Sequence, residues 1–183
     1  MAVEEPYGIV DGQELEQGDF ITQCPVIIPE YTSKTVEEQK AGKATTYQIH
    51  AKEYTYDVVI MNQSCDLENG KLKLVVLCPY WSLKEIVEIH DNFRSKKMQE
   101  KLRQGYIPGY HMFNACTLED MEREIQVVNF HMMFTVPYDF LTTFASTLGK
   151  RLRLLSPYKE KMSHAFGNYF SRVGLPKDIP PFS

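Results

Sequence analysis

Two short apolar runs, separated by a segment rich in turn-forming residues, limit the folds open to this chain. Val58–Met61 is continuously apolar, and Leu72–Cys78 mixes leucines with β-branched valines, so both have the character of buried strands. The intervening segment ends in Glu68-Asn69-Gly70, a combination that favours a reverse turn. The sequence therefore predicts that the two runs pair as a hairpin in the core.

Further strands are predicted on either side of this hairpin. Phe20–Ile28 has strand character but contains Pro25, which lacks a backbone N–H, so we expect an edge strand or a bulge. Tyr110–Ala115 and Glu124–Val136 are predicted as later strands. Side-chain alternation along Glu124–Val136 would place His131 on the face opposite its phenylalanine neighbours.

Two helices are predicted between Ser82 and Gly149, in addition to the C-terminal helix described below. One runs from Ser82 to about Gln104 and opens with a capping box formed by Ser82 and Glu85. Its second half is charged and is expected to be exposed; the basic residues there are Arg94, Lys96, Lys97, Lys101 and Arg103. The other helix spans about 138–148, with Gly149 as its C-terminal cap.

The last predicted helix is strongly amphipathic. Ser156 is its expected N-cap, Pro157 takes the first helical position, and an apolar stripe continues to Val173. The stripe packs either on the protein's own sheet or in the groove of a partner. A homodimer interface is another way to bury it.

This order of elements predicts an α+β fold. We expect a small, mostly antiparallel sheet or SH3-like barrel with helices packed on it and a C-terminal amphipathic helix. The 183 residues suffice for a single domain, 1–183. Within it we distinguish a polar lead-in at 1–17, a long loop at 29–46 and a C-terminal helical part at 138–176.

Composition excludes several classes of protein. No apolar run approaches the roughly 20 residues of a membrane span, and the first residues are acidic, unlike a secretory signal. We therefore expect a cytoplasmic protein without membrane contact. Cys24, Cys65, Cys78 and Cys116 form no C-x-x-C pair, so small buried thiols are expected and no metal site. The chain has neither a dinucleotide-binding fingerprint nor a phosphate loop, so no cofactor is expected.

Charge is distributed unevenly along the chain. The net charge of −4 argues against a surface that binds nucleic acid all over. Residues 1–20 carry only acidic charges, whereas 149–172 is basic. The predicted nucleic-acid or partner-binding residues are Lys150, Arg151, Arg153, Lys159, Lys161 and Arg172. They form either a solvated basic face or a docking patch for an acidic partner or a phosphate backbone.

The polar motif Asn62–Leu67 follows a buried strand, where side chains emerge on rigid support. Cys65 and Asp66, together with Ser82, are the candidate catalytic residues. Activation of Cys65 would need a histidine, a cation or a helix N-terminus, because an adjacent carboxylate raises the pKa of a thiol. The alternative is a strand-end turn in which Ser64 and Asp66 bond to nearby backbone and Cys65 is buried.

Part of the first half of the chain resembles a known family. Gly18-Asp19-Phe20, then Asp57–Asn62, then Val75–Pro79 follow one another in an order similar to that of MazF/PemK-like proteins. Those proteins are small SH3-like barrels, and many are endoribonuclease toxins of toxin–antitoxin systems. The resemblance implies a barrel and RNA cleavage, with Ser82 loosely matching the family's Ser/Thr. Tyr56 and Asp57 stand where that family usually has arginine and proline.

A second resemblance rests on three strings of residues. Gln63–Leu67, Arg151–Tyr158 and Ser171–Pro176 together resemble an uncharacterised group of bacterial proteins. This implies a bacterial origin, and either resemblance fits a mobile-element or phage-defence locus.

Three functional hypotheses remain open. The first is a non-catalytic bacterial binding module that contacts nucleic acid or an acidic protein through the basic C-terminal region. The second is a divergent MazF-like endoribonuclease with Cys65, Asp66 and Ser82 near the substrate. The third is a subunit that acts only within a complex.

Overall fold

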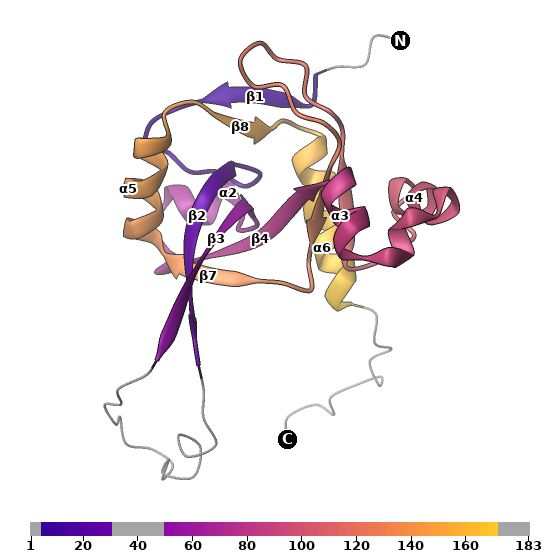
Figure 1. Cartoon of the computed structure of the whole chain (residues 1–183). Helices are drawn as coiled ribbons and strands as arrows, with labels where there is room; N and C mark the ends of the chain where they lie inside the picture. The colour runs from indigo at the N-terminus through magenta and orange to yellow at the C-terminus, as the bar shows by residue number, and fades with distance from the viewer. Residues whose placement is uncertain (1–4, 31–49, 172–183) are drawn as a thin grey trace, which may run out of the picture.

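A computed structural model describes residues 5–30 and 50–171 of the chain (Figure 1). Its main sheet has the strand order β2-β3-β4-β6-β5, β7 also pairs with β4, and all of these pairings are antiparallel. The strands are β2 (Phe20–Pro29), β3 (Ala51–Ile60), β4 (Leu74–Ser82), β5 (Tyr110–Phe113), β6 (Gln126–Asn129) and β7 (Phe134–Pro137). The predicted α+β class is confirmed. The sequence predicted either a sheet or an SH3-like barrel, and the structure has an open sheet that does not close into a barrel.

The predicted core hairpin is confirmed as the pairing of β3 with β4. Val59 lies opposite Cys78 and Ile60 lies opposite Leu77. The connection is longer than the predicted turn, because the short helix α2 (Ser64–Glu68) forms its first part. This helix buries Leu67 completely in the core, which explains why the chain coils there.

Strand β2 is an edge strand with a bulge, as Pro25 predicts. The register with β3 shifts between Ile21 and Cys24, and Gln23 in the bulge has a φ of 51°. The Gln23 N–H donates to Asp57 Oδ1 at 2.8 Å. Beyond the bulge, β2 and β3 leave the rest of the sheet as a two-stranded ribbon (Figure 1). Most of the predicted loop 29–46 lies outside the described residues.

A second, two-stranded sheet joins the two ends of the chain. It pairs β1 (Tyr7–Val10) with β8 (Arg151–Leu154) in antiparallel register. The sequence-based division is wrong here, because β1 lies in the predicted polar lead-in and β8 lies in the predicted helical part. Leu152 and Leu154 are buried, so β8 presents alternate residues to the core.

The predicted helix from Ser82 to Gln104 is wrong as a single element. It is divided into α3 (Leu83–Ile89), the 3₁₀ turn η1 (Asp91–Arg94) and α4 (Lys96–Arg103). His90 has an extended backbone, and the break allows Phe93 to pack with Ile86 in a small satellite core. The capping box of Ser82 and Glu85 is confirmed at the start of α3.

The predicted strand Glu124–Val136 is also wrong as a single element. β6 pairs with the end of β4, at Tyr80–Ser82, and β7 pairs with its beginning, at Leu74–Leu77. The chain must reverse its path between the two, so His131 lies in a turn and does not alternate along a strand. The His131 N–H donates to Asn129 Oδ1 at 2.9 Å within this turn.

Two helices complete the described chain. α5 (Tyr138–Leu148) is confirmed, and Gly149 follows it. α6 (Tyr158–Phe170) begins two residues after Ser156, which is therefore not its N-cap. The Ser156 hydroxyl instead donates to Glu160 Oε1 at 2.7 Å.

The apolar stripe of α6 packs on the protein's own core. Met162 is fully buried, and the ring of Phe166 lies edge-on to Phe130 at a centroid distance of 5.2 Å. The predicted end of this helix beyond Ser171 lies outside the described residues. Within 5–30 and 50–171, no helix is long and apolar enough to cross a membrane.

Candidate functional site

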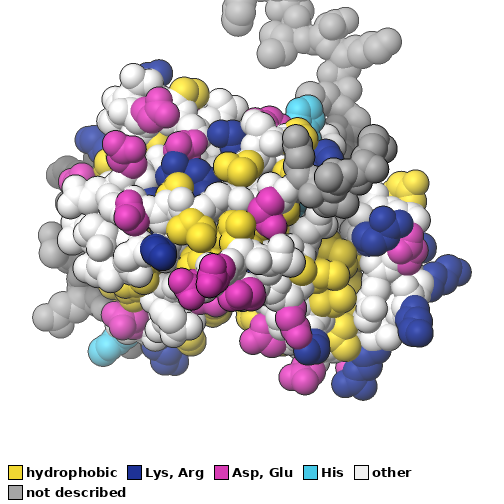
Figure 2. All heavy atoms as spheres, turned by 90° about the horizontal axis from the view of Figure 1, so that it is seen from above, with side chains coloured by type: hydrophobic (Ala, Val, Ile, Leu, Met, Phe, Trp, Pro, Cys, Tyr) yellow, Lys and Arg dark blue, Asp and Glu magenta, His cyan; other side chains and the backbone are white. Residues whose placement is uncertain are grey.

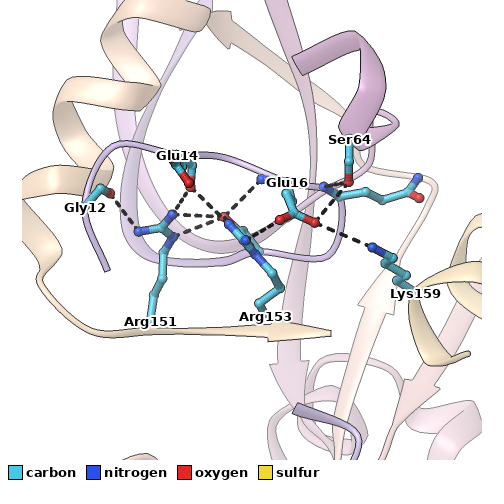
Figure 3. Close-up of polar contacts among 9 residues, drawn as sticks. Gly12, Glu14, Glu16, Ser64, Arg151, Arg153 and Lys159 are labelled. Carbon is cyan, nitrogen blue, oxygen red and sulfur yellow. Dashed lines mark hydrogen bonds and ion pairs between the residues drawn. The ribbon is translucent and has the colours of Figure 1, made fainter. Parts of the chain in front are cut away.

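An ion-pair cluster lies between β8, the segment before β2, and the start of α6 (Figure 3). Asp19 and Arg151 are almost completely buried, with 0% and 2% of their side chains exposed. Arg151 Nη2 lies 3.1 Å from Asp19 Oδ2, and its Nη1 donates to the Gly12 carbonyl at 2.9 Å. Arg153, on the same strand, also binds Asp19 and places Nη1 2.5 Å from Glu16 Oε1.

The cluster extends to α6 and to α2. Lys159 Nζ lies 3.5 Å from Glu16 Oε2, and the Ser64 hydroxyl donates to the same oxygen at 3.4 Å. Gln17 N–H donates to the Ser64 oxygen at 3.2 Å. Ser64 of the polar motif is therefore part of a partly buried hydrogen-bond network that reaches the ion-pair cluster.

These contacts correct the prediction of a basic docking region. Arg151, Arg153 and Lys159 are paired with Asp19 and Glu16, the acidic residues of the chain's own beginning. Lys150, by contrast, is exposed and lies 4.0 Å from Asp120, and Arg172 lies outside the described residues. Of the predicted residues within the described part, only Lys161 has no carboxylate within ion-pair distance there.

The structure does not bring the candidate catalytic residues together. Ser82 ends β4, whereas Cys65 and Asp66 follow the opposite end of the β3–β4 ladder. The Ser82 hydroxyl accepts the Glu85 N–H at 3.2 Å, and Asp66 lies 3.8 Å from Lys71 on the surface. Cys65 is exposed, not buried as the turn alternative expects, and its sulfur lies 3.8 Å from Gln63 Oε1.

A groove lies elsewhere, between α6 and the segment that leads into β5. It consists of two neighbouring cavities of about 670 and 370 Å³, both lined by His111 and Lys161. We call this pair of cavities the α6 groove. Tyr110 and His164 also line the larger cavity, and Arg103 and Tyr158 line the smaller one.

The walls of the groove are set by β5 and by α6. His111 is held on β5 by its pairing opposite Val128 of β6. Lys161 and His164 are three residues apart on α6 and so share one face of the helix. Gly109, with a φ of 92°, is the last residue of the turn before β5, and a Cβ there would overlap the His131 ring.

Burial and a neighbouring cation act on His111. Burial, with a smaller contribution from the Lys161 charge, lowers the pKa of His111 to about 4, so its ring is neutral at pH 7. Among residues 5–30 and 50–171, none hydrogen-bonds to this ring. Lys161 Nζ lies 5.2 Å from the centroid of the Tyr158 ring, a cation–π contact that leaves its N–H groups able to donate.

The exposed face of α4 adds positive charge beside the groove. Lys96, Lys97 and Lys101 are exposed and form no ion pair within the described part of the chain. Arg103, at the end of this helix, pairs with Glu100 and lines the smaller cavity. Figure 2 shows Lys and Arg side chains gathered on the right of the molecule, where Figure 1 places α4.

Tyr110 and Tyr158 line the groove, and further aromatic rings lie close to it in space or in sequence. The Tyr110 ring lies 5.1 Å from the His131 ring, which in turn lies 5.1 Å from the Tyr169 ring. Tyr106 is 71% exposed and stands between Gly105 and Ile107, two residues that line the larger cavity. Flat rings are thus available beside Lys161.

Another cavity of similar size is less suited to a charged ligand. It measures about 680 Å³, and its lining combines apolar side chains, such as Val87 and Ile125, with the two carboxylates of Glu88 and Glu124. The lysine on its rim, Lys84, is paired with Glu124. This cavity therefore lacks the unpaired cation and the histidines of the α6 groove.

The sequence pointed to one residue of the groove, Lys161, but not to its histidine partners. His111 is one of five histidines in the chain, and nothing local distinguishes it. The K-x-x-H spacing of Lys161 and His164 on a predicted helix was the sequence pattern that could have indicated that the two side chains share one face. Among the described residues, no group of three or more His, Cys, Asp or Glu side chains could hold a metal ion.

Comparison of the chain with protein-family models, with curated proteins and with solved structures finds no match.

Proposed function

We propose that this protein is a bacterial binding module that holds single-stranded nucleic acid in the α6 groove. The observation that carries the proposal is Lys161, a cation without a carboxylate partner among the described residues, at the junction of two cavities. A phosphate group is the ligand that such a lysine, next to a neutral imidazole, fits best.

The surroundings of Lys161 support a polymer rather than a single phosphate. The lysines of α4 continue the positive charge past the end of the groove. Tyr110 and Tyr158 line the groove, and the exposed ring of Tyr106, next in sequence to the lining residues Gly105 and Ile107, is accessible for a base to stack on. A basic groove combined with aromatic rings is the usual way to bind single strands without reading a defined sequence.

Glu160 is the described acidic residue that lines the groove, and its carboxylate accepts the Ser156 hydroxyl. The net charge of −4 repels nucleic acid from most of the surface, and Arg151 and Arg153 are already neutralised. Binding is therefore expected to depend on the α6 groove and on α4.

Fluorescence anisotropy with a labelled single strand, at several salt concentrations, tests the proposal. Removal of one phosphate-contacting lysine in Lys161→Ala should weaken binding and reduce the slope of log affinity against log salt by about 1. Lys71→Ala removes an exposed lysine outside the groove and should leave binding unchanged. Absence of binding at low salt, or equal affinity of the two variants, would refute the proposal.

A further inference from the structure

The α6 groove holds two imidazoles and an ammonium group in one cavity. His111 contributes to one wall from β5, and His164 and Lys161 contribute to the other wall from α6. The proposed binding function uses the cation, the aromatic rings and the neutral ring of His111 as a neighbour of the phosphate, and it gives neither histidine a chemical role.

Two imidazoles that line one cavity can serve the two halves of a proton transfer, one as acceptor and one as donor. His111 is half-buried, neutral at pH 7 and without a described hydrogen-bond partner, so it has a nitrogen lone pair to accept a proton. His164 is exposed on α6 and lines the same cavity, so its ring can reach a strand bound there. Lys161, one helical turn before His164, can stabilise negative charge on a phosphate between them.

We propose, resting on the binding function above, that the α6 groove cleaves single-stranded RNA, with His111 as proton acceptor and His164 as proton donor. His111 takes the proton of a ribose 2′-hydroxyl, whose oxygen forms a bond to the neighbouring phosphorus. The bond from phosphorus to the 5′-oxygen breaks, and this oxygen takes a proton from the imidazolium of His164. The products are a 2′,3′-cyclic phosphate and a 5′-hydroxyl, and no oxidant, reductant or co-reactant is needed.

This site is distinct from the one the sequence suggested for RNA cleavage. Ser82 serves as a helix cap, and Cys65 and Asp66 lie at the other end of the β3–β4 ladder. The proposed chemistry requires the 2′-hydroxyl, so a strand of DNA should bind in the groove and remain intact.

The experiment incubates a labelled RNA strand with the full chain in buffer containing EDTA and identifies the product ends by mass spectrometry. The wild type should give cyclic phosphate ends. His111→Ala and His164→Ala should each lower the rate at least about 100-fold. His50→Ala, an exposed histidine on the ribbon, should cleave like the wild type.

Binding of an all-2′-deoxy strand, measured on the same preparations, separates this inference from the proposed function. His164 is exposed, so its replacement should leave the fold intact, and the affinity of His164→Ala for the deoxy strand is measured beside its cleavage rate. Binding without RNA cleavage overturns the inference and leaves the binding function in place. Equal cleavage by the wild type and His164→Ala also overturns it, since the activity would then come from elsewhere, and loss of all binding overturns both.

Discussion

At the scale of single residues, the buried Asp19 is the charge that the fold can least leave unpaired. Both of its partners, Arg151 and Arg153, come from β8. Replacing Arg151 by alanine removes one of them and should lower the free energy of unfolding by about 3–5 kcal/mol. Chemical denaturation measures this, with the exposed Lys150→Ala as the matched control. Similar stabilities of the two variants would contradict the assigned role of the cluster.

The cysteines should differ sharply in reactivity. Burial raises the pKa of Cys24 and of Cys78 to about 12, and it also raises the pKa of Cys116. Cys65 is the exposed thiol of the four. Since the thiolate is the reacting form, a maleimide at neutral pH should label Cys65 first in the native protein, and the others only on unfolding. Peptide mapping checks this, and early labelling of Cys24 or Cys78 would count against the described core.

His111 should make stability depend on pH. Its pKa is about 4 in the folded chain, against about 6.5 in an unfolded one. Between these values the unfolded state takes up a proton that the folded state refuses, so the free energy of unfolding falls as pH drops through this window. The loss attributable to this group should reach up to about 3 kcal/mol near pH 4 and grow no further below it.

Denaturation of wild type and His111→Phe at pH 7 and at pH 4.5 measures that loss. Lys161 is the charged group that acts on the ring from α6, and it is positive throughout this range. The variant should lose less stability on acidification than the wild type. An equal loss in both proteins would show that His111 is not desolvated in the groove.

At the scale of elements, two serines at helix starts offer a direct comparison. Ser82 caps α3 through a full capping box, whereas Ser95 precedes α4 without any side-chain cap bond. Ser82→Ala should therefore cost about 1 kcal/mol of stability, and Ser95→Ala should cost clearly less. Thermal or chemical unfolding compares them, and an equal effect would mean that the capping box contributes nothing measurable.

Elements with a local signal were predictable from the sequence, and those that depend on distant partners were not. The β3–β4 hairpin, the bulge beside Pro25 and helix α5 follow from residue patterns within a few positions. The β1–β8 sheet could not be recognised, because Tyr7 finds its partner at Leu154. Likewise, the two strands taken for one at Glu124–Val136 separate only because they pair with opposite ends of β4.

In the candidate site, too, features with a local sequence pattern were predictable and features that depend on distant residues were not. Lys161 stood out by its charge, but the importance of His111 depends on the packing of β5 against α6, which no local pattern reports. Arg151 and Arg153 were misread, because the sequence displays their charges and not the buried Asp19 that neutralises them. Long-range electrostatic pairing is the information that the linear pattern lacked.

At the scale of the whole molecule, the acidic beginning of the chain and the basic strand β8 neutralise each other. The same part of the chain supplies β1, which pairs with β8 in the second sheet. The positive charge that stays exposed beside the groove is that of α4 and of Lys161. The uneven charge of the sequence is thus largely an internal feature of the fold, and the proposed ligand-binding face is a smaller area than the sequence suggested.

The most direct test of the account is nuclear magnetic resonance of the histidine side chains during titration with an all-2′-deoxy single strand. If the α6 groove holds the strand, the ring signals of His111 and His164 should shift together as the strand is added, while the signals of His50 should not. Unchanged His111 and His164 signals at a strand concentration where binding is complete would contradict it.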